Sequence, residues 1–162
     1  MATYDKSLAN KTNFLLTFDK APGVQYFCQG LTIPAVSLDG VELDTGRHNY
    51  LDVGGNLQFE ELVISFLVDE NLTNYKEIYD WFMLLRSPLA GNPGSHITTS
   101  TEKSDATITV LDNNKNPQVR FGFVDCWPTS LSGLTYDVMV AGDEPQVGEI
   151  TLSYSYYTME TV

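Results

Sequence analysis

Apolar and polar side chains alternate along most of this chain, and this period of two predicts β-strands. The clearest case is a strand in which Leu62, Ile64, Phe66 and Val68 share one face. The same pattern predicts strands in seven other places. They lie at 13–19, 24–31, 36–43, 105–111, 118–126, 134–141 and 149–158.

Turn-forming residues separate these strands. Pro22 and Gly23 predict a tight turn that joins the first two strands as a hairpin. The glycine-punctuated stretch 39–57 predicts a long hairpin or extended loop, and 127–133 is expected to link two strands. Residues 88–104 are rich in glycine, proline, serine and threonine, which predicts a long loop.

One segment, 72–86, has helical spacing instead. The acidic and amide side chains of 69–71 suit a helix N-terminus, and Pro88 ends the pattern. Trp81 and Leu84 fall outside the apolar stripe, so we expect them to be exposed on an isolated subunit and buried by a partner. The stripe itself consists of Tyr75, Ile78, Tyr79, Phe82 and Leu85.

Length and charge limit what the chain can be. Its 162 residues fit one mainly β domain at 13–158, with a flexible polar arm at 1–12 and a short tail at 159–162. We expect two packed antiparallel sheets with one flanking α-helix, a sandwich or barrel-like fold. The net charge of -12 argues against recognition of nucleic acid through its phosphates. An acidic wall can still face DNA, because it repels the strand and cannot trap it.

The cysteines and the N-terminal residues indicate a cytosol-like compartment. Cys28 and Cys126 lie in apolar stretches, where a free cysteine behaves as a small buried hydrophobe. No stretch approaches the roughly 20 apolar residues of a membrane span. Residues 1–10 lack the apolar core of a secretion signal. We therefore expect no membrane partner.

Candidate catalytic groups are scarce. His48 and His96 lie in polar or glycine-rich loops without a metal-ligand companion, and the familiar nucleophile, metal and nucleotide motifs are missing. Neighbouring carboxylates such as Glu60 and Glu61 point to opposite faces of a strand, whereas a glycosidase needs two that flank one sugar. The sequence therefore predicts a protein that is not an enzyme and needs no cofactor or metal.

Four segments in succession resemble one known family. They are NFLLTFDKAPGVQYFCQGLTIP, ISFLVDENLTNYKEIYDWFMLL, SDATITVLDNNKNPQVRFGFVDCWPTSLSGLTYD and EITLSYSYY. The most specific parts are the helix entry V-D-E-x-L-x-N-Y and the link D-C-W-P-T-S-L-S-G-L. Over about 13–158 the chain thereby resembles the tail tube proteins of contractile-tailed bacteriophages and related contractile injection systems.

The resemblance implies a structural virion protein that works by assembly with copies of itself. Such proteins form hexameric rings that stack into the inner tail tube, with inner sheets closed around a conduit for DNA. A long hairpin, which corresponds to 39–57 here, reaches the next ring. The implied partners are other copies, the tail sheath, and baseplate or neck proteins. The implied location is the virion tail, after assembly in the host cytoplasm.

Two alternatives remain beside a repeated tube subunit. The polar arm and the glycine-rich loop are features that related adaptor or initiator rings use at the baseplate or neck. A carbohydrate-binding β-sandwich is an alternative of another class, because Tyr154, Tyr156 and Tyr157 could stack on sugars. However, Tyr154 and Tyr156 share a predicted strand face with apolar residues, which favours a place in the core.

Strand alternation also suggests which side chains line the conduit and which meet a neighbour. Small polar and acidic residues share one face of two predicted strands, and such a face leaves a smooth acidic wall. The candidates for this wall are Asp105, Thr107, Thr109, Glu149, Thr151 and Ser153. The candidates for contacts between subunits are Tyr50, Leu51, Val53, Trp81 and Leu84.

Overall fold

The computed structural model describes residues 8–44, 46–86, 102–139 and 144–162. Most of the secondary structure in these ranges is antiparallel β-sheet, as the alternation predicts. The helices are α1 (Pro22–Phe27) and α2 (Thr73–Leu85). The strands are β1 (Phe14–Phe18), β2 (Cys28–Thr32), β3 (Val36–Asp44), β4 (Asn49–Phe59), β5 (Leu62–Leu67), β6 (Ser104–Leu111), β7 (Pro117–Leu131), β8 (Val147–Ser153) and β9 (Tyr156–Thr161).

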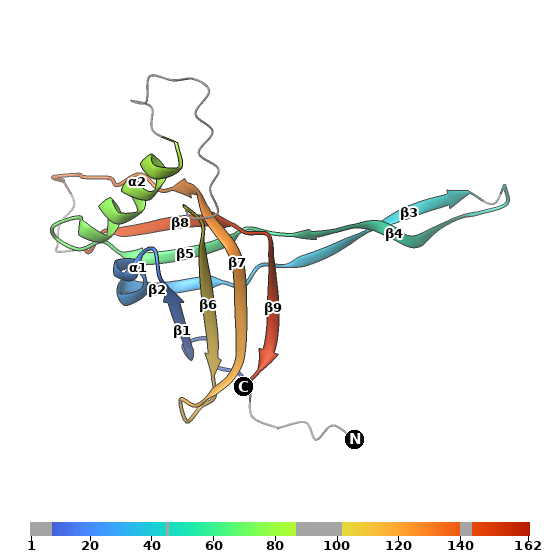
Figure 1. The fold of residues 1–162 in the computed structure, drawn as a ribbon, viewed down its shortest axis with the longest axis horizontal. Helices are drawn as coiled ribbons and strands as arrows, with labels where there is room; N and C mark the ends of the chain where they lie inside the picture. The colour runs from blue at the N-terminus through green and yellow to red at the C-terminus, as the bar shows by residue number, and fades with distance from the viewer. Residues whose placement is uncertain (1–7, 45, 87–101, 140–143) are drawn as a thin grey trace.

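The domain consists of two sheets that share strand β7. Sheet A contains β1, β6, the first part of β7, and β9. Sheet B contains the last part of β7 (127–131), β8, β5 and β2, in that order. Figure 1 shows the strands of the two sheets crossing steeply. The predicted class, two packed antiparallel sheets, is confirmed.

The core lies between the sheets, and α1 and α2 close one end of it. Inward-facing pairs such as Ile64 with Ile150 stand opposite one another in sheet B, and Ile108 pairs with Phe121 in sheet A. Figure 1 shows both helices beside the end of sheet B opposite the long hairpin, with β1 of sheet A leading up to α1. Sheet A and the helices together therefore cover the inner face of sheet B, while its outer face stays open.

The predicted hairpin around Pro22 and Gly23 is wrong. Proline begins the short helix α1, where its missing N–H is no loss. β1 pairs with β6, and β2 pairs with β5. Gly23 is needed because α1 lies against α2: a Cβ there would lie 2.8 Å from the Cβ of Asn74. Turn chemistry and a helix start thus share the same residue types.

Helix α2 is where predicted, but a different face of it is buried. Ile78 is in the core as expected, yet Tyr79 is exposed and Asn74 is buried. The Asn74 side-chain amide donates to the Leu67 carbonyl oxygen at 2.7 Å, and its oxygen accepts from the Tyr75 N–H at 2.8 Å. A hydrogen-bonded amide therefore occupies a core position that apolar periodicity assigns to solvent.

The second half of the chain departs from the predicted strands in three places. The predicted link 127–133 is largely strand, because β7 continues into sheet B as far as Leu131. The described part of the predicted strand 134–141 is not strand. The run 149–158 is split between β8 and β9, and β9 includes 159–161, which we expected to be a tail. Most of the predicted loop 88–104, with His96, and most of the arm 1–12 lie outside the described residues.

The long hairpin is confirmed, and it projects far from the body. β3 and β4 pair only with each other among the described strands. Figure 1 shows them extending from the end of sheet B opposite the helices. An eleven-residue strand such as β4 spans about 36 Å. Nearly every hairpin side chain is exposed.

Candidate assembly surfaces

Sheet B has two unpaired edges. Within the described part of the chain, β2 pairs with β5 alone and 127–131 pair with β8 alone. Each edge is five residues long. Free edges of matched length are sites where another chain can extend a sheet. The sequence alone could not reveal them, because an edge depends on which strands pair.

The outer face of sheet B carries one of the two predicted wall groups. Glu149, Thr151 and Ser153 alternate with the core residues of β8 and point outward. Glu149 stands opposite Ser65, and Thr151 stands opposite Val63. The face therefore combines one carboxylate and small polar side chains with the apolar side chains of Val63, Leu67 and Val147. That these residues line a conduit stays a prediction.

The other predicted wall group lies on the opposite side of the molecule. Asp105, Thr107 and Thr109 belong to β6 in sheet A, and alternate with core residues. Thr109 is only 8% exposed, so it is not part of an open face. Because the sheets pack core to core, their outer faces point away from each other. One sheet face cannot contain both groups, so at most one of them can belong to a wall that a single sheet forms.

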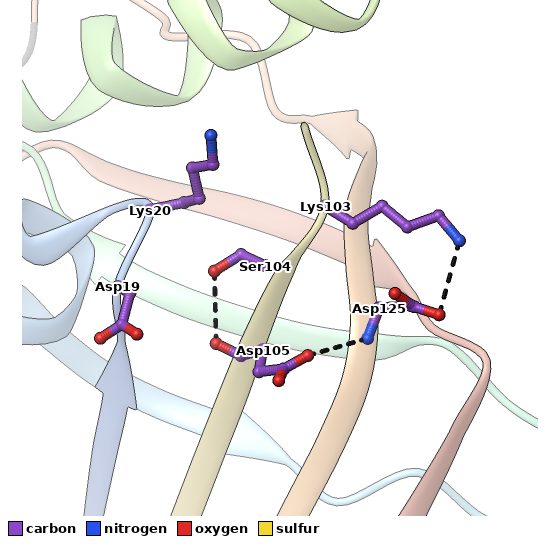
Figure 2. Close-up of a pocket in the computed structure, with 6 residues that line it drawn as sticks. All are labelled: Asp19, Lys20, Lys103, Ser104, Asp105 and Asp125. Carbon is purple, nitrogen blue, oxygen red and sulfur yellow. Dashed lines mark hydrogen bonds and ion pairs between the residues drawn. The ribbon is translucent and has the colours of Figure 1, made fainter. Parts of the chain in front are cut away.

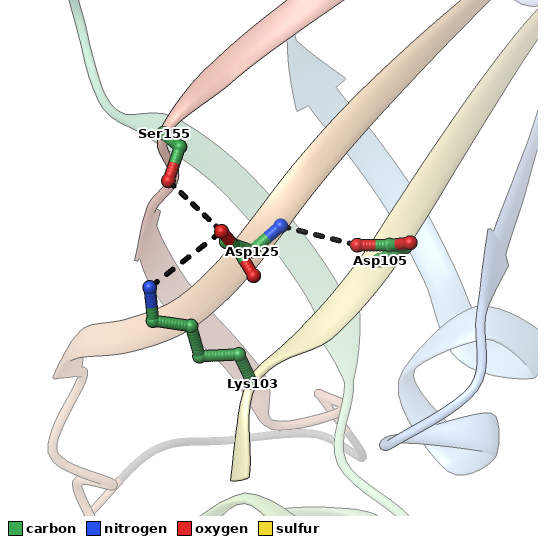
Figure 3. A network of polar contacts seen from close by, with 4 residues as sticks. All are labelled: Lys103, Asp105, Asp125 and Ser155. Carbon is green, nitrogen blue, oxygen red and sulfur yellow. Dashed lines mark hydrogen bonds and ion pairs between the residues drawn. The ribbon is translucent and has the colours of Figure 1, made fainter. Parts of the chain in front are cut away.

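Asp105 has a structural partner at the corner where β7 leaves sheet A (Figure 3). Asp125 has a φ of 59° at this bulge, which is unusual for a residue with a side chain. Its N–H donates to Asp105 Oδ1 at 3.1 Å, and its carboxylate accepts from Ser155 Oγ at 3.2 Å. Lys103 lies 3.7 Å from the same carboxylate. These contacts stabilise the bend that lets β7 join both sheets.

A shallow polar depression lies beside this corner (Figure 2). Its lining combines three carboxylates with two lysines. Figure 2 shows Lys103 reaching toward Asp125, while Lys20 lies 3.9 Å from the Glu102 carboxylate. Among the described residues no group of histidine, cysteine and carboxylate side chains is placed to hold a metal. The depression is lined by Asp19, Lys20, Lys103, Ser104, Asp105 and Asp125.

The hairpin exposes apolar side chains on both of its faces. Leu51 and Val53, two of the predicted contact residues, are 75% and 80% exposed and share a face with Leu57. Tyr50, also predicted, lies on the other face, where Leu43 is its cross-strand partner. An isolated two-stranded ribbon is marginal in water, so a partner that covers both faces would stabilise it.

The two predicted contact residues on α2 have different surroundings. Leu84 is exposed, as expected. Trp81 is only 2% exposed, and the expectation that it is exposed on an isolated subunit is wrong. Its ring packs 5.5 Å from that of Phe18, and its indole N–H donates to the Glu102 carbonyl oxygen at 2.7 Å.

One exposed aromatic side chain and one exposed apolar segment were missed by sequence reasoning. Tyr26 on α1 is 82% exposed, and Tyr136, Val138 and Met139 are 71%, 99% and 86% exposed. The alternation in 134–139 led us to predict a strand there, and alternation normally accompanies burial on one face. The signal was therefore present, but in the described part of the chain these side chains stay exposed.

The cysteines and tyrosines are structural. Burial raises the pKa of the Cys126 thiol to about 12, so this group stays protonated and unreactive. Tyr154 and Tyr157 pack with Phe123 in an aromatic cluster, with ring centroids 5.0 and 5.3 Å from the phenylalanine. Tyr156 is about half exposed, against our expectation of a core position. Tyr154 and Tyr157 therefore do not form a sugar-stacking platform.

One further finding concerns membranes. In the ranges that the structure describes, no helix is long and apolar enough to span a bilayer.

Comparison with known proteins agrees with the fold. Residues 10–158 match the family described as T4-like virus tail tube protein gp19. The tail tube terminator protein of Enterobacteria phage T4 is 24% identical over 159 residues, covering 94% of this chain and 89% of the phage protein. Both similarities extend over nearly the whole domain.

Solved structures of contractile systems share the architecture. The tube-terminating cap of the anti-feeding prophage superposes with a TM-score of 0.70 at 18% identity, covering 100% of this chain and 97% of the cap chain. A sheath-tube complex of an extracellular contractile injection system in its extended state gives 0.66 at 19% identity, covering 97% and 94%. At such identities the likeness shows a shared fold. Taken with the match over 10–158, these observations show that the chain belongs to the T4-like virus tail tube protein family.

Proposed function

We propose that copies of this chain close into a ring, six by family resemblance, that sits at an end of a contractile tail tube. The observation that carries this proposal is the pair of free edges on sheet B. The role is structural, in the virion tail, and involves no catalysis. The ring contacts the tube on one side and a baseplate or neck protein on the other, with the sheath around it.

The order of strands in sheet B permits closure into a barrel. Neighbouring strands in the series 127–131, β8, β5 and β2 are antiparallel, so the two edge strands run in opposite directions. When a second copy is placed beside the first by rotation about a ring axis, its residues 127–131 run antiparallel to β2 of the first copy. An even number of strands in sheet B thus supports a continuous antiparallel wall, which removes both exposed edges of that sheet.

The same closure makes the outer face of sheet B the wall of the conduit. The inner face is already covered by sheet A and the two helices, so the outer face is the one left for the lumen. Glu149, Thr151 and Ser153 would then line the bore, and the β6 group would lie outside it. A carboxylate repeated around the ring repels the phosphates of passing DNA.

The hairpin supports contact along the tube axis. It continues the direction of sheet B away from the body, beyond any other element of the subunit. Its exposed apolar side chains on both faces would be buried by a neighbouring ring. Leu51, Val53 and Tyr50 are the contact residues in this arrangement.

The likeness to a tail tube terminator and to a tube-terminating cap favours an end ring over a repeated subunit. The family description and the likeness to a chain from a sheath-tube complex favour the repeated subunit, which is the second candidate. The two differ in stoichiometry, since a repeated subunit outnumbers any single-ring protein in the same particle.

Quantifying the chain in purified particles tests this choice. We expect one ring, about six copies per tail by resemblance to closed cyclic assemblies of the family. Quantitative mass spectrometry against a single-ring baseplate protein as internal standard gives the ratio. A ratio close to one supports the end ring, and a ratio of ten or more would establish the repeated subunit.

Reversing the charge of the wall tests the assignment of the lumen. Glu149→Lys should leave rings intact and slow DNA ejection, most strongly at low salt where screening is weak, because a ring of lysines attracts phosphate. Ejection rates from particles that carry the variant give the measurement. Glu160→Lys, on exposed β9 of sheet A, is the matched control and should eject normally. If both variants eject DNA at the same rate, Glu149 does not line the conduit, and the proposed ring is unaffected.

A further inference from the structure

Each free edge of sheet B has exposed apolar side chains next to it in the sequence. α1 comes directly before β2 in the chain, and 132–139 come directly after the edge 127–131. Figure 1 shows both segments at the same end of sheet B, opposite the hairpin, but along its two different edges. Within one subunit, β8, β5 and β2 therefore separate them.

Ring closure would bring the two segments together. β2 runs from α1 toward the hairpin, whereas 127–131 run the other way and end where 132–139 begin. When β2 of one copy pairs antiparallel with 127–131 of the next, the start of β2 meets the end of that edge. α1 of the first copy then lies beside 132–139 of the second. This follows from strand direction alone, given the closure.

The chemistry of the two segments suits such a contact. Tyr26 projects from α1 almost fully exposed, and Tyr136, Val138 and Met139 are exposed on the other segment. Each of these four residues is more than two thirds exposed, and together they can supply part of the roughly 1,600 Å² that a standard interface buries in total. The paired edges would supply much of the remaining area.

The alternation of 134–139 has an explanation in the same contact. Leu134, Tyr136 and Val138 are spaced as on a half-buried strand, yet the segment has no strand partner among the described residues. It lies in line with the edge of sheet B, so the surface that would bury one side of it belongs to the adjacent copy. Exposed aromatic and methionine side chains are also the types enriched at interfaces.

We propose that Tyr26 of one copy packs against Tyr136, Val138 and Met139 of the next copy in the same ring, as a lateral clamp beside the closed sheet. This inference rests on the proposed ring and names its lateral contact. The clamp lies at the end of the ring opposite the hairpins. It therefore differs from the contact that the hairpin makes along the axis.

Crosslinking of assembled rings tests the clamp. Tyr26→Cys and Val138→Cys are combined in a Cys28→Ser background, since Cys126 is buried. A short bismaleimide should then give a ladder of covalent oligomers on a denaturing gel that ends at the ring number. Each single-cysteine variant should remain monomeric on the same gel. As a matched control, Leu15→Cys replaces Tyr26→Cys, because Leu15 is exposed on β1, which belongs to sheet A and to neither edge of sheet B.

The outcomes separate the clamp from the ring itself. Electron microscopy first shows whether the wild-type chain forms rings, and a chain that forms none overturns both proposals. If rings form and the double variant gives no ladder, the clamp is wrong and the ring survives. A ladder that continues beyond the ring number places the contact between stacked rings and overturns the clamp. The clamp is also overturned if the Leu15→Cys control gives a ladder as strong as that of the Tyr26→Cys variant.

Discussion

Replacing Trp81 with alanine is expected to destabilise the isolated subunit by about 3–5 kcal/mol, the usual cost of removing a large buried aromatic side chain. The loss has two physical parts. The cavity beside Phe18 would be only partly refilled, and the Glu102 carbonyl oxygen would lose its indole donor. Denaturant unfolding of the subunit under conditions that prevent assembly measures the free energy of unfolding.

Two further variants separate packing from hydrogen bonding and from assembly. Trp81→Phe keeps most of the volume but loses the indole N–H, so it should cost less than the alanine variant. Leu84→Ala, three residues along the helix and 56% exposed, should change the stability of the subunit by less than about 0.5 kcal/mol. If Trp81→Ala unfolds like the wild type while failing to assemble, Trp81 contacts a partner instead of the core.

Replacing Gly55 with alanine is expected to abolish attachment between rings while the body of the subunit stays folded. A Cβ at this position would clash with the Asp39 carbonyl oxygen, which belongs to the backbone, so the main chain at the irregularity between β3 and β4 would have to shift. β3 and β4 pair with no other described strand, and the hairpin reaches the body only at its base, where Phe59 packs against Tyr154 and Tyr157, so the body should stay folded. Circular dichroism and denaturant unfolding report on the body, and electron microscopy reports on the attachment of rings to tubes.

Gly40→Ala is the matched control within the same hairpin. Its nearest neighbour would be Leu51 Cδ2 at 3.1 Å, the end of an exposed and flexible side chain that can turn aside. This variant should therefore attach normally. Normal attachment of the Gly55 variant, with the distortion of its hairpin verified by hydrogen exchange, would show that the hairpin does not carry the contact between rings.

The exposure of the predicted contact residues could be read from the sequence on the hairpin but not on α2. Leu51 and Val53 were correctly expected to be exposed, because a long glycine-punctuated hairpin has no body to pack against. Trp81 was misplaced because helical periodicity identifies an apolar stripe, and the buried Asn74 amide shifts that stripe on α2. The hydrogen bonds of Asn74 with the main chain of Leu67 and Tyr75 determine which face of α2 is buried, and apolar periodicity takes no account of hydrogen bonds.

The same limit explains the errors in strand boundaries. The alternation in 134–139 resembles that of β5. However, β5 lies between β8 and β2, whereas 134–139 pair with no strand among the described residues. Alternation reports that one face of a segment is suited to burial. It does not report whether the burying surface belongs to the same chain, and for an assembling protein the two cases look alike in sequence.

Local chemistry by itself determined the β class, the long hairpin and the position of α2, since each depends on residues adjacent along the chain. The resemblance carried by the helix entry and by 125–134 pointed to the family. Only the tertiary structure decided that β7 serves two sheets, because the bend at Asp125 depends on Asp105, Lys103 and Ser155, which are distant in sequence. It likewise decided that Glu149 and Asp105 lie on opposite outer faces, since the face of a strand acquires a direction in space only when its sheet packs on another.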